Sequence, residues 1–123
     1  MILRESSEDY LERILILELA NGKVKSIDIA NDMDFSKPSV SVAMKKLKES
    51  NYISIDENGY IHLTIEGRKI ASSVYERHLV LTEALMLLGV KEEIAKIDAC
   101  KIEHDLSKES YECIKSHLKQ QKK

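Results

Sequence analysis

The spacing of hydrophobic residues along the chain changes twice, from a helical period to an alternating one and back. Apolar residues recur every three or four positions before residue 51 and after residue 64, which predicts helices. Between these segments they alternate with polar residues on both sides of Asp56–Gly59, which predicts a β-hairpin with a tight turn. Helices are expected over residues 6–20, 26–33, 36–50, 64–88, 90–105 and 107–118, and hairpin strands over 52–55 and 60–63.

Short polar residues and glycines mark where these helices begin and end. A serine hydroxyl at a helix start accepts a hydrogen bond from a backbone N–H group that has no partner within the helix. A proline in the first turn, here Pro38, is tolerated because the N–H group that it lacks would be unpaired there. Gly22 and Gly89 follow two of the helices, as glycines often do. The expected N-caps are Ser6, Ser26, Ser36 and Ser107.

The order of the elements is that of a winged helix followed by a helical layer. A short helix, a turn at Asp34-Phe35 and a second helix with small polar residues at its start form a helix-turn-helix, and the hairpin behind it is the wing. The helix over 64–88 carries a heptad-like seam, which predicts packing against further helices and a second chain. The expected fold is mostly α with a small β-hairpin wing, as a winged helix-turn-helix domain over 1–70 and a helical dimerisation domain over 71–123.

Composition limits the classes of protein to consider. The chain has 123 residues, 43% of them hydrophobic, which is enough for the core of one or two small domains. No apolar run approaches the roughly 20 residues that span a bilayer, and the first residues lack the pattern of a signal peptide. The two cysteines, Cys100 and Cys113, make no disulfide framework. A cytoplasmic location is expected.

Charge points to nucleic acid only locally. The whole chain has a net charge of −2, but residues 36–50 contain four lysines and one glutamate, a local +3. Hydroxyls, lysines and helix N-termini commonly contact DNA phosphates, whereas the alternative interpretation is a solvated helix face. Val42 and Ala43 stand where a longer polar side chain could have reached a base edge. The candidate DNA-binding residues are Ser36, Lys37, Pro38, Ser39, Ser41, Lys45 and Lys46.

Cys100, Glu103 and His104 form the group of residues with the richest chemistry. On one helix these three positions share a face, because residues three and four apart are neighbours. A thiol, a carboxylate and an imidazole together can form half of a transition-metal site. The alternative is a partly buried cysteine beside a solvated Glu–His pair.

Other candidate ligands are spread along the chain. His78 occupies a seam position where leucine would pack better, so it is either a ligand or a buried, hydrogen-bonded histidine. Asp9 and Glu12 are three residues apart on the first helix. For Asp9 the alternative is a capping box with Ser6.

Taken together, these motifs resemble the metal-dependent repressors of the diphtheria toxin repressor and manganese transport regulator type. The resemblance covers nearly the whole chain. It implies a cytoplasmic homodimer that binds operator double-stranded DNA when a divalent metal is bound, in the shorter architecture without an SH3-like domain. Neither a membrane nor a small organic substrate is among the implied partners. The motifs are Ser7-Glu8-Asp9-Tyr10-Leu11-Glu12, Ser36-Lys37-Pro38-Ser39-Val40-Ser41, Leu63-Thr64-x-x-Gly67, Arg77-His78, Leu87-Leu88-Gly89-Val90 and Cys100-x-x-Glu103-His104-x-Leu106-Ser107.

The resemblance also implies the ligand set and its metal. Cys100 departs from the manganese branch, which usually has a glutamate there, while the iron branch has a cysteine, together with a methionine where this chain has Asp9. Carboxylates suit Mn²⁺ and a thiolate suits softer ions, so the cofactor is expected to be Mn²⁺ or Fe²⁺, with Zn²⁺ or Co²⁺ binding in vitro. Thr82 and Lys96 replace ligands of the iron branch's accessory site, so no accessory site of that kind is expected. A different accessory arrangement, using Glu12, Cys100 and Glu103, stays open. The implied ligands are Asp9, Glu12, His78, Cys100, Glu103 and His104.

The predicted function is that of a metal-responsive transcriptional repressor of metal-ion homeostasis. A metal that joins the first helix to the helical layer would restrict the spacing of the two recognition helices of a dimer. One alternative is a winged-helix regulator that senses a non-metal signal. A small metalloenzyme is the other, but the chain has no His-Glu-x-x-His motif, Gly-rich phosphate loop or nucleophile elbow, and no catalytic residue is predicted.

Overall fold

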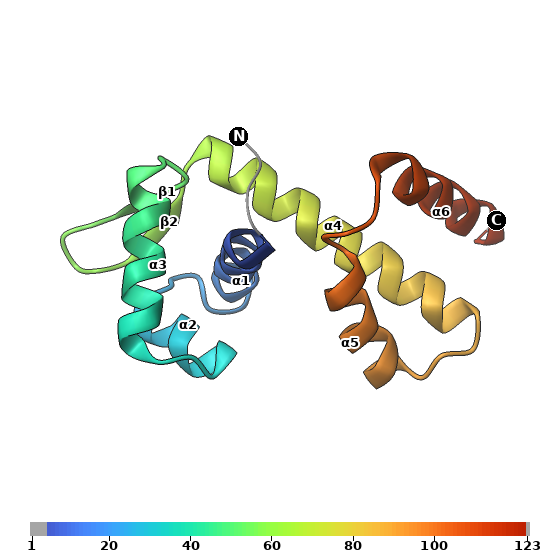
Figure 1. Ribbon diagram of the computed structural model, residues 1–123, viewed down its shortest axis with the longest axis horizontal. Helices are drawn as coiled ribbons and strands as arrows, with labels where there is room; N and C mark the ends of the chain where they lie inside the picture. The colour runs from blue at the N-terminus through green and yellow to red at the C-terminus, as the bar shows by residue number, and fades with distance from the viewer. Residues whose placement is uncertain (1–4, 123) are drawn as a thin grey trace. The chain divides into compact units, whose positions relative to one another are not determined.

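The computed structural model describes residues 5–122 and forms two compact units that divide between Ser72 and Ser73 (Figure 1). The expected fold class, mostly α with a small β-hairpin, is confirmed. Residues 1–4, on which the expected lack of a signal peptide partly rests, lie outside the described residues. The elements are α1 (Glu5–Asn21), α2 (Ser26–Met33), α3 (Lys37–Glu49), β1 (Ile53–Ile55), β2 (Ile61–Leu63), α4 (Ile65–Leu87), α5 (Glu92–Ile102) and α6 (Lys108–Gln121).

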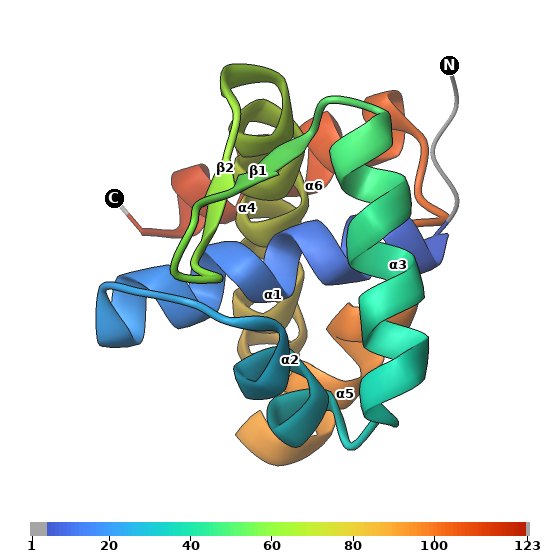
Figure 2. The same cartoon turned by 90° about the vertical axis from the view of Figure 1, so that its left-hand side faces the viewer.

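The first unit is built around α1, which contacts α2, α3 and β2. Its buried residues Leu11, Ile14 and Leu15 recur at helical spacing, so one face of α1 enters the core. Helix α3 buries Val40, Met44 and Leu47 in the same core, and it lies beside β1 (Figure 2). Burial of one face of α3 leaves the opposite face of this helix exposed.

The hairpin behind α3 is the expected wing. Ile53 pairs with Leu63 and Ile55 with Ile61 in antiparallel register. In the turn, the side chain of Asp56 accepts hydrogen bonds from the backbone of Asn58 and Tyr60, at 2.9 and 3.0 Å. The N–H of Ile61 donates to the carbonyl of Val24 at 2.7 Å, which ties the wing to the α1–α2 connection.

Thr64 and Gly67 join the wing to α4. The hydroxyl of Thr64 donates to the carbonyl of Asn51 at 2.9 Å and accepts from the N–H of Gly67 at 3.1 Å. The backbone of Tyr52 passes so close to Gly67 that a Cβ atom there would lie 1.9 Å from the Tyr52 carbonyl oxygen. Only glycine fits this contact.

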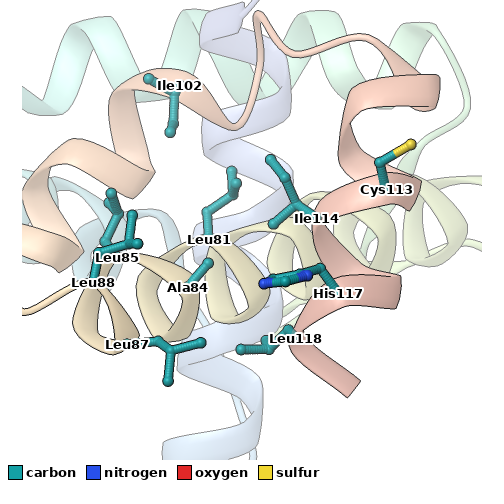
Figure 3. A pocket seen from close by; sticks show the side chains of 10 residues that line it. All are labelled: Leu81, Ala84, Leu85, Leu87, Leu88, Ile102, Cys113, Ile114, His117 and Leu118. Atoms are coloured by element: carbon teal, nitrogen blue, oxygen red, sulfur yellow. The ribbon is translucent and has the colours of Figure 1, made fainter. Parts of the chain in front are cut away.

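The second unit contains the rest of α4 together with α5 and α6. Leu81 of α4, Ala95 and Ala99 of α5, and Tyr111 and Leu118 of α6 are buried. An apolar groove of about 380 Å³ lies between α4 and α6, with Ile102 of α5 at its edge (Figure 3). The groove is lined by Leu81, Ala84, Leu85, Leu87, Leu88, Ile102, Cys113, Ile114, His117 and Leu118.

Two of the expected N-caps are confirmed and two are wrong. Ser36 accepts from the N–H of Ser39 at 3.3 Å, and Ser107 accepts from that of Ser110 at 3.1 Å. Lys25, not Ser26, is the N-cap of α2, because the side chain of Asp28 accepts a hydrogen bond from the Lys25 N–H at 2.9 Å. Helix α1 begins at Glu5, so Ser6 lies inside its first turn. The capping-box alternative for Asp9 therefore lacks the cap that it needs.

Candidate metal centre and nucleic-acid interface

The segment with Cys100, Glu103 and His104 is not one continuous helix. Helix α5 ends at Ile102, three residues before the expected end, so Cys100 lies on the helix while Glu103 and His104 lie in the turn after it. From α4, the Arg77 guanidinium donates to the carbonyls of Glu103 at 3.2 Å and Leu106 at 2.7 Å. These bonds satisfy two backbone carbonyls of the turn, which holds the turn after α5 in place.

Glu103 lies at the centre of the ligand candidates in this unit. Its side chain is buried, with 1% of the residue exposed, and Oε2 lies 3.0 Å from Nδ1 of His78 on α4. The two ligand atoms of one metal ion also stand about 3 Å apart, given bonds of about 2.1 Å. Within the described residues, Oε1 of Glu103 receives no hydrogen bond. A buried carboxylate oxygen of this kind fits a cation.

Two further donors surround Glu103. Nε2 of His104 lies 3.4 Å from Oε1 of Glu103, and the His104 side chain is almost wholly buried. A carboxylate oxygen of Glu103 and the Cys100 thiol sulfur lie within 4.8 Å of each other. The second unit therefore brings together two imidazoles, one carboxylate and one thiol, a donor set that fits a divalent transition metal.

Asp9 and Glu12 belong to the first unit. They are one turn apart on α1, which puts both carboxylates on one face of this helix. Asp9 is partly exposed, whereas Glu12 is buried, with 4% of the residue exposed. Charged carboxylates are rarely buried, so the burial of Glu12 sets it apart from the exposed acidic residues of the chain.

A polar network on α4 and α6 holds the turn in place, and the sequence did not reveal it. The Arg77 guanidinium stacks 4.9 Å from the centre of the Tyr111 ring, and the Tyr111 hydroxyl donates to Glu76 at 2.9 Å. Lys115 also donates to Glu76. Hydrogen bonds from Lys115 and Tyr111 lower the pKa of Glu76, while burial and the bond to Glu76 raise the pKa of Tyr111 to about 12. The motif Arg77-His78 was the only sequence signal for this network.

The candidate DNA-binding residues form an exposed surface in the first unit. All seven lie on α3 or at its N-cap, and each is exposed. The hydroxyl of Ser36 donates to that of Ser39 at 2.8 Å, so the start of α3 presents a cluster of hydroxyl groups. Ser26 and Ile27 of α2 lie with Lys37 and Ser41 around a small pocket of about 210 Å³. The surface is polar and positively charged, as contact with a phosphate backbone requires.

The wing carries both signs of charge. Its tip is acidic at Asp56 and Glu57, and the hydrogen bond from His62, at 2.9 Å, is the main cause that lowers the pKa of Asp56. At its base, the ammonium groups of Lys23 and Lys25 lie 4.9 and 4.8 Å from the centre of the Tyr60 ring. Positive charge beside α3 therefore continues to the base of the wing but not to its tip.

Two family models match the chain and together cover nearly all of it. Residues 2–63 match the N-terminal DNA-binding domain of iron-dependent repressors, and residues 64–123 match their metal-binding and dimerisation domain. The chain belongs to the iron-dependent repressor family. The predicted resemblance, and the prediction of a metal-dependent regulator of transcription, are confirmed at the level of this family.

Curated relatives of this chain include proteins named MntR. The transcriptional regulator MntR of Salmonella typhimurium is 33% identical over 117 residues, which are 95% of this chain and 74% of that protein. The HTH-type transcriptional regulator MntR of Geobacillus kaustophilus is 37% identical over 102 residues, 83% of this chain and 72% of that protein.

Solved structures of the same family share the fold. The manganese regulator SloR has a TM-score of 0.81 and 31% identity, with 92% of this chain and 53% of that chain covered. A manganese-dependent transcriptional repressor in complex with manganese has a TM-score of 0.84 and 26% identity, with 91% and 52% covered. The chain thus spans about half the length of these solved relatives. In the part of the chain that the structure describes, no helix has the length and apolar character needed to cross a membrane.

Replacing Arg77 by alanine is expected to weaken metal binding about 10- to 100-fold, as loss of a residue that orients metal ligands typically does. The two carbonyl bonds that fix the turn of Glu103 would be lost. Isothermal titration with Mn²⁺ measures the change. Arg68→Ala is the matched control, because Arg68 lies on the same helix but pairs with Glu18 in the first unit. Equal affinities of the Arg77 and Arg68 variants would show that Arg77 does not position the ligands.

Proposed function

We propose that this chain is a homodimeric, metal-activated repressor that binds operator DNA through α3 and responds to Mn²⁺ or Fe²⁺. The observation that carries the proposal is the buried Glu103 carboxylate, which contacts His78 and lies beside His104 and Cys100. A buried group of this composition is costly to keep without a cation, and family membership supplies the class of cation. The role proposed is regulatory rather than catalytic, in the cytoplasm, without membrane or small organic substrate as partner.

We assign the metal ligands to both units. His78, Cys100, Glu103 and His104 would come from the second unit and Asp9 and Glu12 from the first. The assignment of Asp9 and Glu12 rests on their motif position and on their shared face of α1. A bound divalent ion would supply the charge that lets these acidic and neutral donors converge. Cys100 adds a thiolate to a set otherwise suited to Mn²⁺, which favours softer ions such as Fe²⁺ or Zn²⁺ in competition.

The division of labour follows the domain boundary that the sequence predicts. Residues 1–70 would bind DNA and residues 71–123 would bind metal and form the dimer. The division of the structure after Ser72 and the family-model boundary after residue 63 both fall near this position. Support for a second chain comes from apolar residues that stay exposed in the second unit, including Leu88 at 80%. The others are Leu79, Met86, Leu87, Ile94, Ile97 and Ile102.

Function is tested by a DNA-binding titration run in parallel with Mn²⁺, Fe²⁺ under anaerobic conditions, Zn²⁺ and Co²⁺. Wild-type chain is expected to bind a selected operator only with metal, and Asp9→Ala is expected to lose this response while it remains a dimer by light scattering. Because a ligand that prefers the folded state stabilises it, the same metals should also raise the melting temperature of the wild type. Metal-independent DNA binding by the wild type would instead support a regulator that senses a non-metal signal.

A further inference from the structure

The exposed face of α3 has an apolar side chain at its centre. Val42 is 56% exposed, although it lies between Val40 and Met44, which are both buried. Because successive residues of a helix are about 100° apart, Val42 points away from the core that receives these two neighbours. Its neighbours one turn away on the exposed face are Pro38 and Ser39 before it and Lys45 and Lys46 after it, all exposed.

The chemistry of this face narrows what α3 can recognise in DNA. Arginine or lysine on guanine, and asparagine or glutamine on adenine, make the strong bidentate contacts to base edges, and of these four residue types α3 contains only lysine. Its serines and lysines suit phosphates, and a lysine can also reach guanine. Val42 can form no hydrogen bond through its side chain. The one apolar group that a base pair presents in the major groove is the 5-methyl group of thymine.

We propose that Val42 is a specificity-determining residue that contacts the 5-methyl group of one thymine in each half of the operator. The inference rests on the proposed function, because it requires that α3 enters the major groove. Lysines and hydroxyls on either side of Val42 hold the helix against the phosphates, and the valine side chain adds an apolar contact that selects thymine. A β-branched residue at an exposed helical position gains nothing from helix propensity or core packing, so contact with a partner gives this residue a role.

A substitution in the DNA tests the contact directly. Deoxyuridine differs from thymidine only in the missing methyl group, so its base pairing and hydrogen-bonding edge are unchanged. A duplex is first selected from a random pool by the wild-type chain with Mn²⁺ or Fe²⁺, and each thymine is then replaced in turn. One position per half-site is expected to weaken binding about fourfold, and both together about fifteenfold, as for loss of one buried methyl group each.

Variants of the chain test whether Val42 is the residue that contacts the thymine methyl group. Val42→Ala removes two methyl groups, and Val42→Thr keeps the shape but replaces one methyl group with a hydroxyl. Both should bind more weakly than wild type, and the penalty for deoxyuridine should nearly vanish in Val42→Ala. Folding is preserved because the side chain is exposed and alanine has the higher helix propensity. Leu19→Ala, which truncates an exposed apolar residue of α1, is the control that should keep the full penalty.

The possible results separate this inference from the proposed function. Val42 does not contact a thymine methyl group if no deoxyuridine substitution weakens binding, or if such a substitution weakens binding of Val42→Ala as much as binding of wild type. Metal-dependent repression stands in either case. If the wild-type chain selects no sequence with any metal, the proposed function is wrong and the inference falls with it. A penalty confined to one thymine per half-site and abolished by Val42→Ala supports both.

Discussion

Replacing Glu103 by glutamine is expected to remove most of the stabilisation of the protein by metal and to weaken metal-dependent DNA binding. Glutamine keeps the size of the side chain but removes the negative charge beside His78 and His104. Metal affinity should fall more than about 100-fold, beyond the 10- to 100-fold typical for residues that only orient ligands. At a metal concentration about 1,000 times the wild-type Kd, wild type gains about 4 kcal/mol, and the variant should gain about 1.4 kcal/mol or less.

Stability without metal separates a ligand from a packing residue. A buried charge costs free energy to desolvate, so metal-free Glu103→Gln should be as stable as wild type or more stable. Melting curves with a chelator measure the metal-free stability, and melting curves with Mn²⁺ measure the stabilisation by metal. Glu112→Gln, the same change at an exposed position of α6, should leave the metal-free stability and the stabilisation by metal unchanged. A large loss of stability in metal-free Glu103→Gln would mean that Glu103 is kept for the fold.

Replacing Gly67 by alanine is expected to destabilise the protein by about 2 kcal/mol or more, as overpacking against an immobile neighbour does. Alanine normally stabilises a helix relative to glycine by about 1 kcal/mol, so intrinsic propensity predicts the opposite sign. The contact with Tyr52 determines the sign of the change in stability. The new Cβ would lie 1.9 Å from the carbonyl oxygen of Tyr52, and moving that backbone costs free energy. Urea unfolding measures the change.

Ser72→Ala is the control for this substitution, since Ser72 is exposed on the same helix. It should change the free energy of unfolding by only a few tenths of a kcal/mol. In Gly67→Ala the start of α4 must move away from Tyr52, which weakens the bonds from Thr64 to Asn51 and Tyr52 that join it to the wing. A variant as stable as wild type would show that the junction relaxes freely.

Several features of the fold follow from local sequence rules alone. The N-caps Ser36 and Ser107, the wing turn at Asp56–Gly59 and the end of α4 before Gly89 each depend on a few neighbouring residues. Hydrogen bonds from short side chains and the positive φ of Gly59 and Gly89 act over one turn of chain. Periodicity and these signals together were sufficient for the order of helices and strands.

Contacts between residues distant in the sequence determine features that local rules do not predict, such as the turn after α5. The sequence extended α5 through Asp105, but Arg77, more than twenty residues away, binds the carbonyls of Glu103 and Leu106, and the helix ends at Ile102. No pattern within residues 90–105 reveals this contact with Arg77.

Ligand chemistry was therefore determined by the sequence, and ligand placement by the tertiary structure. Residue types and motif order sufficed to predict Glu103 and His104 as candidates beside Cys100 and to indicate the family. The turn that carries Glu103 and His104 is held by the guanidinium of Arg77, which lies on another helix. The physical reason is that helix propensity varies by a few tenths of a kcal/mol per residue, whereas a charged donor to two backbone carbonyls contributes more.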